Sequence, residues 1–462
     1  MIGTQVHRAR RVQLTQRTRA PVLLMGNGEL TRNLPMNKLP FRQDSNFLYF
    51  VGCNLPDAAA LIVGEHCTLF LPKPDDDDAL WHGPTPSLDD IGAALGVDAV
   101  RPAAELQDAL LGIEPMTLSV ADESKNALAS GVTGKPLRFG SDHGDELLVD
   151  IVIDMRRCKS DAELDLMAQA AGHTAVAFDA VMRGTSPGGH ERTLTALFEA
   201  ILAARGCTTG YQTILSQRGE VLHNHHHDDP LQAGRLLLLD GGGELGSGYG
   251  VDITRTWPVS GVYSPRQRAA YQAVLDANLA SINLCRPGVR YRDVHDASSL
   301  VIARFLADEG LVTVSPEEAV ERGAQALFFP HGVGHLLGLD VHDLENYGDR
   351  PSYPPDRKRP EQFGTCYLRL DLPLEAGWVV TVEPGFYVVP AILNDPILRE
   401  RFADAVDFDK AAEWVGFGGI RIEDDVAITL EEPRVLTDAV PKTVHDIQSI
   451  VGSGPTAQER LC

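Results

Sequence analysis

Short apolar runs separated by turn residues fill the first third of the chain. Four of these runs are typical of β-strands, and two amphipathic stretches predict short helices. The expected strands are residues 21–25, 47–51, 60–63 and 67–71, and the expected helical stretches are residues 86–113 and 122–130. This pattern predicts an α/β domain of roughly 150 residues, which is an ordinary domain size.

The pattern changes near residue 155. Ser160 is a suitable helix N-cap, and Glu163 three residues later would complete a capping box. Apolar residues at helical spacing follow, and they predict a long helix. Glycine-rich strand pairs come next, together with expected helices at residues 190–205, 265–286 and 291–310. We therefore expect two domains, at residues 1–157 and 158–462, the second with mixed helices and strands.

Three histidines lie in a glycine-rich stretch at residues 329–343, namely His331, His335 and His342. Glycines between the first two disfavour a helix, because each costs roughly 1 kcal/mol there. In an extended conformation His331 and His335 would lie on one face. A glycine-rich loop with incidental histidines explains this stretch equally well when it is taken alone.

Four carboxylates lie at the ends or on the faces of predicted strands. A leucine-rich strand ends at Asp240, and a hairpin after it could bring Asp252 alongside. Glu383 is the last residue before a Pro-Gly break, which ends a strand. Glu423 shares one face of a predicted strand with Arg421. Taken singly, these residues fit turn aspartates and a surface strand as well.

Together the four carboxylates and His335 predict a metal centre. If they converge without a counter-charge, repulsion and desolvation would force protonation. Two divalent cations would balance the charge. Oxygen-rich ligation with one nitrogen suits Mn²⁺ or Co²⁺, and Zn²⁺ is an alternative. Two such ions can activate water and polarise a carbonyl group.

Composition narrows the function further. The chain has 462 residues, 44% hydrophobic and 23% charged, with a formal net charge of −23. This charge would repel phosphate backbones, so nucleic acid is not an expected partner. No apolar run reaches membrane-spanning length, so we expect no membrane association. The seven cysteines are scattered, which favours free thiols in a reducing cytoplasm.

These residues and their flanks resemble aminopeptidase P and prolidase, the proline-specific dinuclear metallopeptidases with a pita-bread catalytic domain. The flanks D-I-T-R-T, H-G-V-G-H-L-L-G-L-D-V-H-D, T-V-E-P-G-F-Y and R-I-E-D-D all carry the likeness. Residues 41–52 also resemble the N-terminal domain of this family. The resemblance implies an α/β N-terminal domain followed by an α+β pita-bread catalytic domain.

The resemblance also implies a role for each site residue. Asp240 and Asp252 would hold one metal ion, Asp252 and Glu423 would bridge, and His335 and Glu383 would complete the other site. Glu383 would also be the base. His331 and His342 would surround the substrate, and His223 would assist proton transfer and substrate binding. Tyr387 and Arg421 would support the ligands from behind, and Arg369 matches a prolidase residue that contacts the substrate carboxylate.

The implied activity is hydrolysis of the Xaa-Pro bond, releasing the N-terminal residue from peptides with proline second. An Xaa-Pro dipeptidase is the alternative, and a non-catalytic pita-bread binding module is a remote one. The family also implies a homo-oligomer, a dimer or a tetramer. The tract His225–His227 is unusual for the family, and it is either an extra metal-binding or gating loop or a solvated turn.

Overall fold

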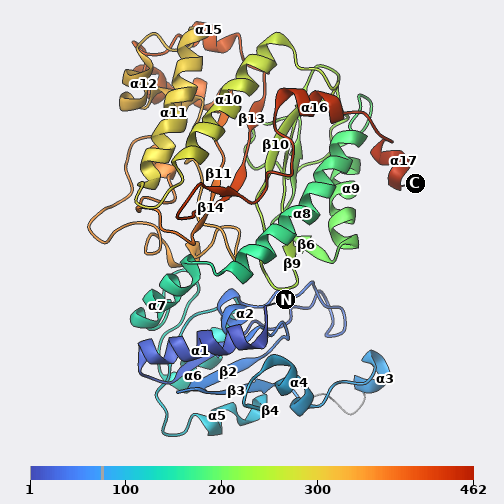
Figure 1. Ribbon diagram of the computed structural model, residues 1–462, viewed down its shortest axis with the longest axis vertical. Helices are drawn as coiled ribbons and strands as arrows, with labels where there is room; N and C mark the ends of the chain where they lie inside the picture. The colour runs from blue at the N-terminus through green and yellow to red at the C-terminus, as the bar shows by residue number, and fades with distance from the viewer. Residues whose placement is uncertain (1, 74–77, 462) are drawn as a thin grey trace. The chain divides into compact units, whose positions relative to one another are not determined.

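The computed structural model describes residues 2–73 and 78–461, and the chain forms two compact units (Figure 1). The first unit comprises Met1–Arg156 and the short segment Leu344–Pro351. The second comprises Arg157–Asp343 and Ser352–Cys462. The segment Leu344–Pro351 therefore belongs to the first unit although it comes late in the sequence.

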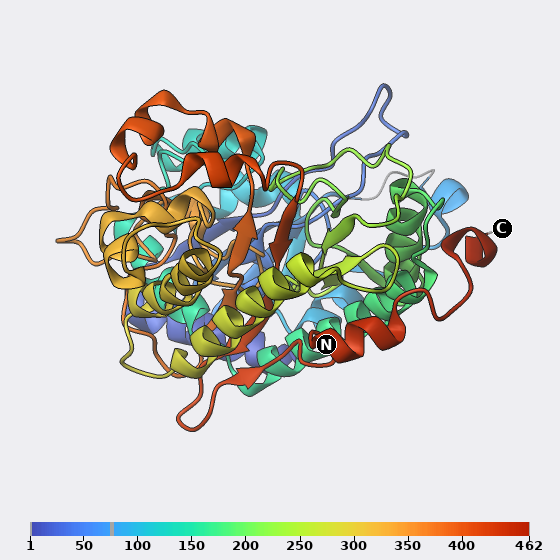
Figure 2. The same ribbon diagram turned by 90° about the horizontal axis from the view of Figure 1, so that it is seen from above.

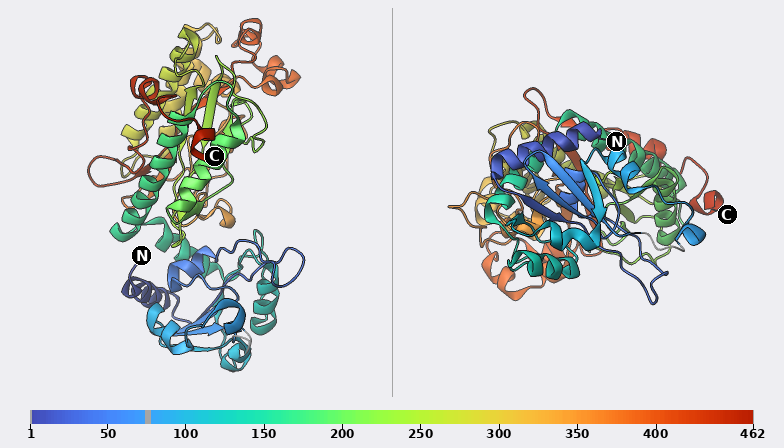
Figure 3. Two further views of the ribbon diagram at one scale, coloured as in Figure 1. Left: turned by 90° about the vertical axis from the view of Figure 1, so that its right-hand side faces the viewer. Right: turned by 90° about the horizontal axis from the view of Figure 1, so that it is seen from below.

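The first unit is built on a five-stranded sheet, with strands β1 (Val22–Met25), β2 (Ala59–Val63), β3 (His66–Leu71), β4 (Ala99–Pro102) and β5 (Met116–Thr117). The strand order is β4-β3-β2-β1-β5, with antiparallel pairs in the middle and a parallel pair at each edge. Buried side chains such as Leu23 and Phe70 form its core. The right-hand view of Figure 3 shows this sheet with its helices, which are α1 (Thr4–Thr18), α2 (Ser45–Val51), α3 (Asp78–His82), α4 (Leu88–Leu95), α5 (Leu106–Ala109), α6 (Glu123–Thr133) and α7 (Glu146–Arg157).

Two sequence predictions in this unit are wrong. Residues 47–51 form part of helix α2 rather than a strand, because the Asp44 side chain caps the helix by accepting the N–H of Phe47. Every residue of α2 is buried, so the apolar run has no polar face to reveal a helical period. Strand β4 also interrupts the expected helical stretch at residues 86–113, since α4 ends at Gly96 in a left-handed conformation.

The second unit contains two pairs of helices that pack together, α8 (Asp161–Gly184) with α9 (Glu191–Ala204) and α10 (Pro265–Leu284) with α11 (Tyr291–Asp308). The N–H of Ser160 donates to Glu163 at 2.9 Å, so the expected cap of the first helix is present. In Figures 1 and 2 the yellow helices α10 and α11 lie side by side. No helix within residues 2–73 and 78–461 has the length and apolar character needed to cross a membrane. The helices of this unit are α8 (Asp161–Gly184), α9 (Glu191–Ala204), α10 (Pro265–Leu284), α11 (Tyr291–Asp308), α12 (Pro316–Arg322), α13 (Pro390–Leu393), α14 (Pro396–Arg401), α15 (Phe408–Ala412), α16 (Val444–Ile450) and α17 (Ala457–Leu461).

Small antiparallel sheets occupy the interior of the second unit, and Figure 2 shows strands between the helices. These strands are β6 (Cys207–Thr209), β7 (Ile214–Ser216), β8 (Leu236–Asp240), β9 (Gly243–Leu245), β10 (Thr254–Pro258), β11 (Val379–Val382), β12 (Gly385–Tyr387), β13 (Gly419–Arg421), β14 (Asp424–Ala427) and β15 (Arg434–Val435). The sheets have the orders β10-β8-β7, β11-β14-β15, β12-β13 and β6-β9. The predicted strand that carries Arg421 and Glu423 is thus interrupted, because β13 ends at Arg421 and β14 begins at Asp424.

The expected pairing that brings Asp240 toward Asp252 is present. Strand β8 pairs with β10 so that Asp240 lies opposite Thr254, and the N–H of Gly241 donates to Ile253. Gly242 then passes so close to the returning chain that an added Cβ would lie 1.6 Å from the carbonyl oxygen of Val251. Only glycine fits there without a backbone shift, and such a shift would move both aspartates.

Replacing Gly242 should therefore destabilise the connection between β8 and β10. We expect Gly242→Ala to lower the free energy of unfolding by about 3 kcal/mol, since the backbone itself must move. Gly246→Ala is the matched control, because no atom lies within 4 Å of its added Cβ. The control should change stability by less than about 0.5 kcal/mol. Urea unfolding of both variants in chelator tests this, and equal stabilities would contradict it.

Candidate metal centre

The predicted metal ligands lie at ends and breaks of strands in the second unit. Asp240 ends β8, Asp252 precedes β10, Glu383 follows β11, and Glu423 separates β13 from β14. His335 lies in an extended segment beside β11. Four of the five residues are buried and Glu383 is half-buried. Segments that are far apart in the sequence therefore deliver these side chains to one interior region.

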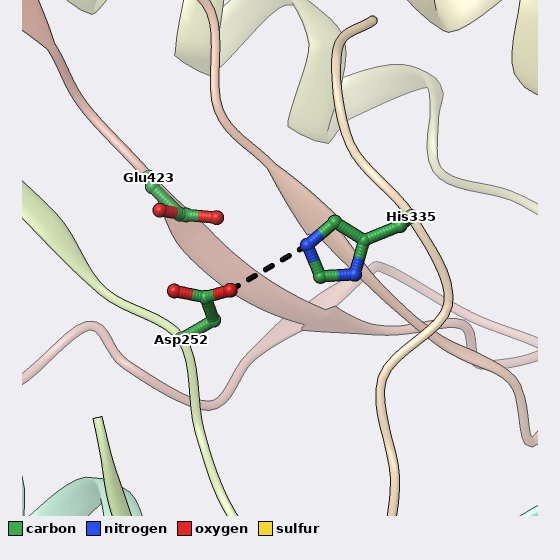
Figure 4. A group of neighbouring side chains, drawn as sticks. All are labelled: Asp252, His335 and Glu423. Atoms are coloured by element: carbon green, nitrogen blue, oxygen red, sulfur yellow. Dashed lines mark ion pairs between the residues drawn. The ribbon is translucent and has the colours of Figure 1, made fainter. Parts of the chain in front are cut away.

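Figure 4 shows Asp252, His335 and Glu423 turned toward a common point. Each offers one possible ligand atom, and these atoms lie within 4.8 Å of one another. The Nε2 atom of His335 is 3.5 Å from Oδ2 of Asp252 and 3.7 Å from Oε1 of Glu383. Carboxylate oxygens with one imidazole nitrogen form a donor set that suits a divalent cation.

Asp240 joins this group through Tyr211. The Tyr211 hydroxyl lies 2.5 Å from Oδ1 of Asp240 and 2.5 Å from Oδ1 of Asp252. The other carboxylate oxygen of Asp240 accepts from Arg421 at 2.5 Å. No motif in the sequence singles out Tyr211, because its two contacts are made with residues 29 and 41 positions further along the chain.

The histidine stretch is held against β11 in an extended conformation. Glu383 donates its N–H to the carbonyl of Val333, and Thr381 donates its N–H to the carbonyl of His335. A Cβ at Gly334, where φ is +154°, would lie 2.3 Å from the Thr381 carbonyl oxygen. The glycine permits this close approach, and both His331 and His335 come near Glu383.

The carboxyl groups carry perturbed pKa values, with burial as the main cause. Burial and the charge of Asp252 raise the pKa of Asp240 to about 6, although Arg421 opposes the shift. Burial likewise raises the pKa of Glu383 to about 7, and burial with the neighbouring carboxylates raises that of Glu423 well above its usual range. Burial would raise the pKa of Asp252 too, but hydrogen bonding and charge from His335 lower it. Such a cluster calls for added positive charge.

A hydrogen-bonded chain runs from Asp240 to His331. Arg421 donates to Asp240 and also to the Tyr387 hydroxyl, at 3.0 Å. That hydroxyl is 2.9 Å from Nε2 of His331, and Nδ1 of His331 is 2.8 Å from the carbonyl oxygen of Gly332. Burial lowers the pKa of His331 to about 3, with Arg421 adding to the effect. His331 is therefore neutral, with its proton on Nδ1.

Thr254 connects two of these groups. Its hydroxyl donates to Oε2 of Glu423 at 2.6 Å and accepts from Nε of Arg421 at 3.0 Å. The Thr254 hydroxyl thus links Arg421 to Glu423 through one donated and one accepted bond. Thr254 lies inside the D-I-T-R-T flank, so the sequence signal was present, but its contact with Glu423 could not be read from spacing.

The remaining predicted residues surround this group. The ring of His342 lies 4.3 Å from that of His335, and the charge of His335, followed by burial, lowers the pKa of His342 to about 3. Burial, then Arg421 and Arg369, lowers the pKa of His223. The charge of Arg369 also acts on His342. The structure thus gathers His223, His342 and Arg369 within electrostatic range of one another.

The tract His225–His227 does not join the described metal-binding group. His225 and His226 are exposed, whereas Nδ1 of His227 lies 3.1 Å from the carbonyl oxygen of Leu215. This environment favours the solvated-turn interpretation.

Two known protein families match the chain. Residues 165–430 match metallopeptidase family M24, and residues 7–115 match the aminopeptidase P N-terminal domain. The chain belongs to metallopeptidase family M24. The M24 match spans the segments that supply all five predicted ligands, and the expected combination of an aminopeptidase P-type N-terminal domain with a pita-bread domain is confirmed.

Proteins with known descriptions align with most of the chain. The "Probable Xaa-Pro aminopeptidase PEPP" of Ajellomyces capsulatus is 31% identical over 92% of this chain and 91% of its own length. The protein of the same description from Pyricularia oryzae is 34% identical over 89% of this chain and 88% of its own length. Aminopeptidase PepP of Pseudomonas aeruginosa superposes with a TM-score of 0.81 at 27% identity, covering 99% of both chains. Aminopeptidase P from E. coli with the inhibitor Pro-Leu gives a TM-score of 0.80 at 27% identity and 99% of both chains.

The perturbed carboxyls of this M24 chain predict an unusual pH dependence in the absence of metal. The pKa of Glu383 is raised from 4.5 to about 7 on folding, so protonation favours the folded state. This contribution to stability is complete below about pH 4.5 and is lost as the pH rises through about 7. In chelator, Glu383→Gln should become progressively more stable than the unmodified protein between these two pH values.

Urea unfolding at pH 5 and pH 8 measures this difference. Glu383→Gln is the matched variant because it keeps the shape of the side chain and removes only the ionisation. If Glu383 binds a cation, saturating Mn²⁺ should reverse the order at pH 8, because the ion would then stabilise the ionised carboxylate. A difference between the two proteins that stays constant with pH in chelator would contradict the expectation.

Proposed function

We propose that this M24 protein is a dinuclear metal-dependent Xaa-Pro aminopeptidase, which releases the N-terminal residue from peptides with proline second. The observation that carries the proposal is the gathering of four carboxylates and one imidazole in a single interior site. The relatives from A. capsulatus and P. oryzae carry this activity in their names, and the similar solved structures are aminopeptidases P.

The proposed ligands are Asp240, Asp252, His335, Glu383 and Glu423, and Mn²⁺ is the proposed metal, with Co²⁺ or Zn²⁺ as alternatives. In this proposal Asp240 and Asp252 would hold one ion, His335 and Glu383 would hold the other, and Asp252 and Glu423 would be shared between them. The 3.7 Å separation of His335 and Glu383 supports this division. When bound, the two ions polarise the scissile carbonyl and acidify a water molecule.

The protein groups around the ligands hold and move protons. Glu383 is the proposed base, and its side chain, 17% exposed, is the least buried of the five proposed ligands. His331 directs an uncharged imidazole into the same space, and its orientation is fixed by Tyr387 and Gly332. In this structure the one N–H of His331 donates to Gly332 and its Nε2 accepts from Tyr387, so donation to a carbonyl oxygen that gains negative charge would require the N–H to leave Gly332. His223 and His342 are proposed to contact the peptide.

A dipeptidase is the second candidate function. Proline lacks an N–H and fixes φ, so either activity requires a site that accepts a rigid tertiary amide. The two differ beyond proline, where a dipeptidase clamps a free carboxylate and an aminopeptidase leaves room for more chain. Arg369 favours the dipeptidase, since its charge reaches His223 and His342 and arginine binds carboxylates bidentately.

The proposal also includes the domain bounds, the cellular location, the substrate and the oligomeric state. Residues 1–157 form the aminopeptidase P-like N-terminal domain, and residues 158–462 form the catalytic domain. The six cysteines among the described residues are free thiols, which supports a reducing, cytoplasmic location. The substrate is a proline-containing peptide. A homo-oligomer, dimer or tetramer, is proposed from the resemblance to the family.

Metal dependence is the first test of the proposed function. Chelation should abolish peptide cleavage, and Mn²⁺ or Co²⁺ should restore it. Asp252→Asn should lose bound metal and more than about 100-fold of activity, since even residues behind a ligand are worth 10–100-fold. The exposed Asp276, on helix α10, supplies the control Asp276→Asn, which should behave as the unmodified protein. Full activity in metal-free protein would exclude the dinuclear proposal.

A peptide panel separates the two candidate activities. We expect Xaa-Pro-Yaa with Mn²⁺-loaded protein to give free Xaa and intact Pro-Yaa, as measured by mass spectrometry. Arg369→Ala should then lower the rate of tripeptide cleavage by a smaller factor than it lowers the rate of Xaa-Pro dipeptide cleavage. Cleavage of Xaa-Pro alone, lost in Arg369→Ala, would make the protein a dipeptidase instead.

A further inference from the structure

An asparagine lies in the middle of helix α10, on its buried face. Asn278 is fully buried and lies in the same stripe as Tyr271, Val274 and Ser281. Asparagine is a poor helix former, and a buried amide is costly unless its donors and acceptor are all used. An apolar residue would suit this position if only helix packing mattered.

The Asn278 amide bonds the backbone immediately before two proposed metal ligands. Its Nδ2 donates to the carbonyl oxygen of Val382 at 3.0 Å, and to that of Ile422 at a longer 3.4 Å. Val382 precedes Glu383, and Ile422 precedes Glu423. One rigid planar group therefore links the two strand breaks from which these carboxylates emerge.

Lys442 fixes the orientation of this amide. Its ammonium group donates to Oδ1 of Asn278 at 2.9 Å. Because an ammonium group can only donate and carbonyl oxygens can only accept, the flipped amide would lose all three bonds. The backbone of Lys442 is itself held by α10, since the Tyr271 hydroxyl donates to its carbonyl oxygen at 2.8 Å.

The same lysine extends the network to the strand that follows Glu423. Lys442 donates to Oδ2 of Asp424 at 2.6 Å, and Arg255 donates to Oδ1 at 2.7 Å. Arg255 also donates to the carbonyl oxygen of Glu423 at 2.5 Å. The side chains of Arg255 and Asp424 are fully buried, and that of Lys442 is 16% exposed, so the network is largely shielded from water and its bonds are strengthened by the low local dielectric.

We propose that Asn278 is a positioning residue for the metal centre, which sets the spacing of Glu383 and Glu423 by tying their preceding carbonyls to helix α10. This inference rests on the proposed function, because it assumes that both carboxylates bind metal. Small errors in ligand position weaken metal binding. A residue that served only the stability of the core would affect unfolding but would leave the metal affinity unchanged.

Asn278→Leu is the informative substitution, since leucine has a similar size and removes both donors. We expect Mn²⁺ to bind 10–100-fold more weakly, as measured by isothermal titration calorimetry, as for other residues that orient ligands. Activity at limiting Mn²⁺ should fall by a similar factor and recover at saturating Mn²⁺. In chelator, amide hydrogen exchange should rise around residues 383 and 423.

Ser281→Ala is the matched control. Ser281 is also fully buried on α10, one turn further along, but it bonds Val294 and Ser298 rather than the ligand strands. It should keep the metal affinity within twofold and leave exchange at these strands unchanged. Asn278→Ser, whose hydroxyl is too short to reach both carbonyls, replaces the leucine variant if that protein does not fold.

The outcomes separate this inference from the proposed function. Unmodified protein that binds Mn²⁺, together with a folded Asn278 variant of equal affinity, would overturn the inference and leave the metal centre intact. Unmodified protein that binds no metal would overturn the metal centre. The exchange measurement in chelator would then decide whether Asn278 positions the two strand breaks, with unchanged exchange counting against it.

Discussion

Four carboxyl groups in one interior site are the constraint on which the second unit depends. Burial and mutual repulsion raise the pKa values of Asp240, Glu383 and Glu423, so the metal-free site favours bound protons over charge. Asp252 alone is held ionised, by His335. Divalent cations would reverse that preference. The architecture therefore makes most sense as a scaffold that brings these groups together at a cost that a bound cation offsets.

The four carboxylates are supplied by strands and strand ends rather than by helices. The two aspartates come from the β8–β10 pair, Glu383 from the end of β11, and Glu423 from the break between β13 and β14. Strand pairing fixes the backbone, while buried donors fix the side chains. Arg421 and Thr254 bond the carboxylates directly, and Asn278 acts one step behind them through backbone carbonyls. Helix α10 thereby takes part in the site although it supplies no ligand.

Part of this arrangement could be predicted from the sequence, because Asp240 and Glu383 each mark the end of an apolar run, while the flanks of the other expected ligands carry the family resemblance. The long helices of the second unit also follow from their periodicity and caps. The helical conformation of residues 47–51 could not be predicted in this way, because a helix that is buried on all sides has no polar face. Tyr211 and Asn278 could not be found either. Their partners lie 29 and 104 residues away, so only tertiary folding defines their contacts.

Tyr211 shows why the site is incomplete without added positive charge. Its hydroxyl has one proton, yet it lies 2.5 Å from an oxygen of Asp240 and equally close to one of Asp252. Only one of these contacts can use that proton. The other needs a second proton on a carboxyl group, and Asp240, with its pKa near 6, is the group that accepts one. A bound divalent cation would supply positive charge in place of that proton. With both aspartates ionised, the Tyr211 hydroxyl could donate to only one of them, so the two short contacts together belong to the protonated site.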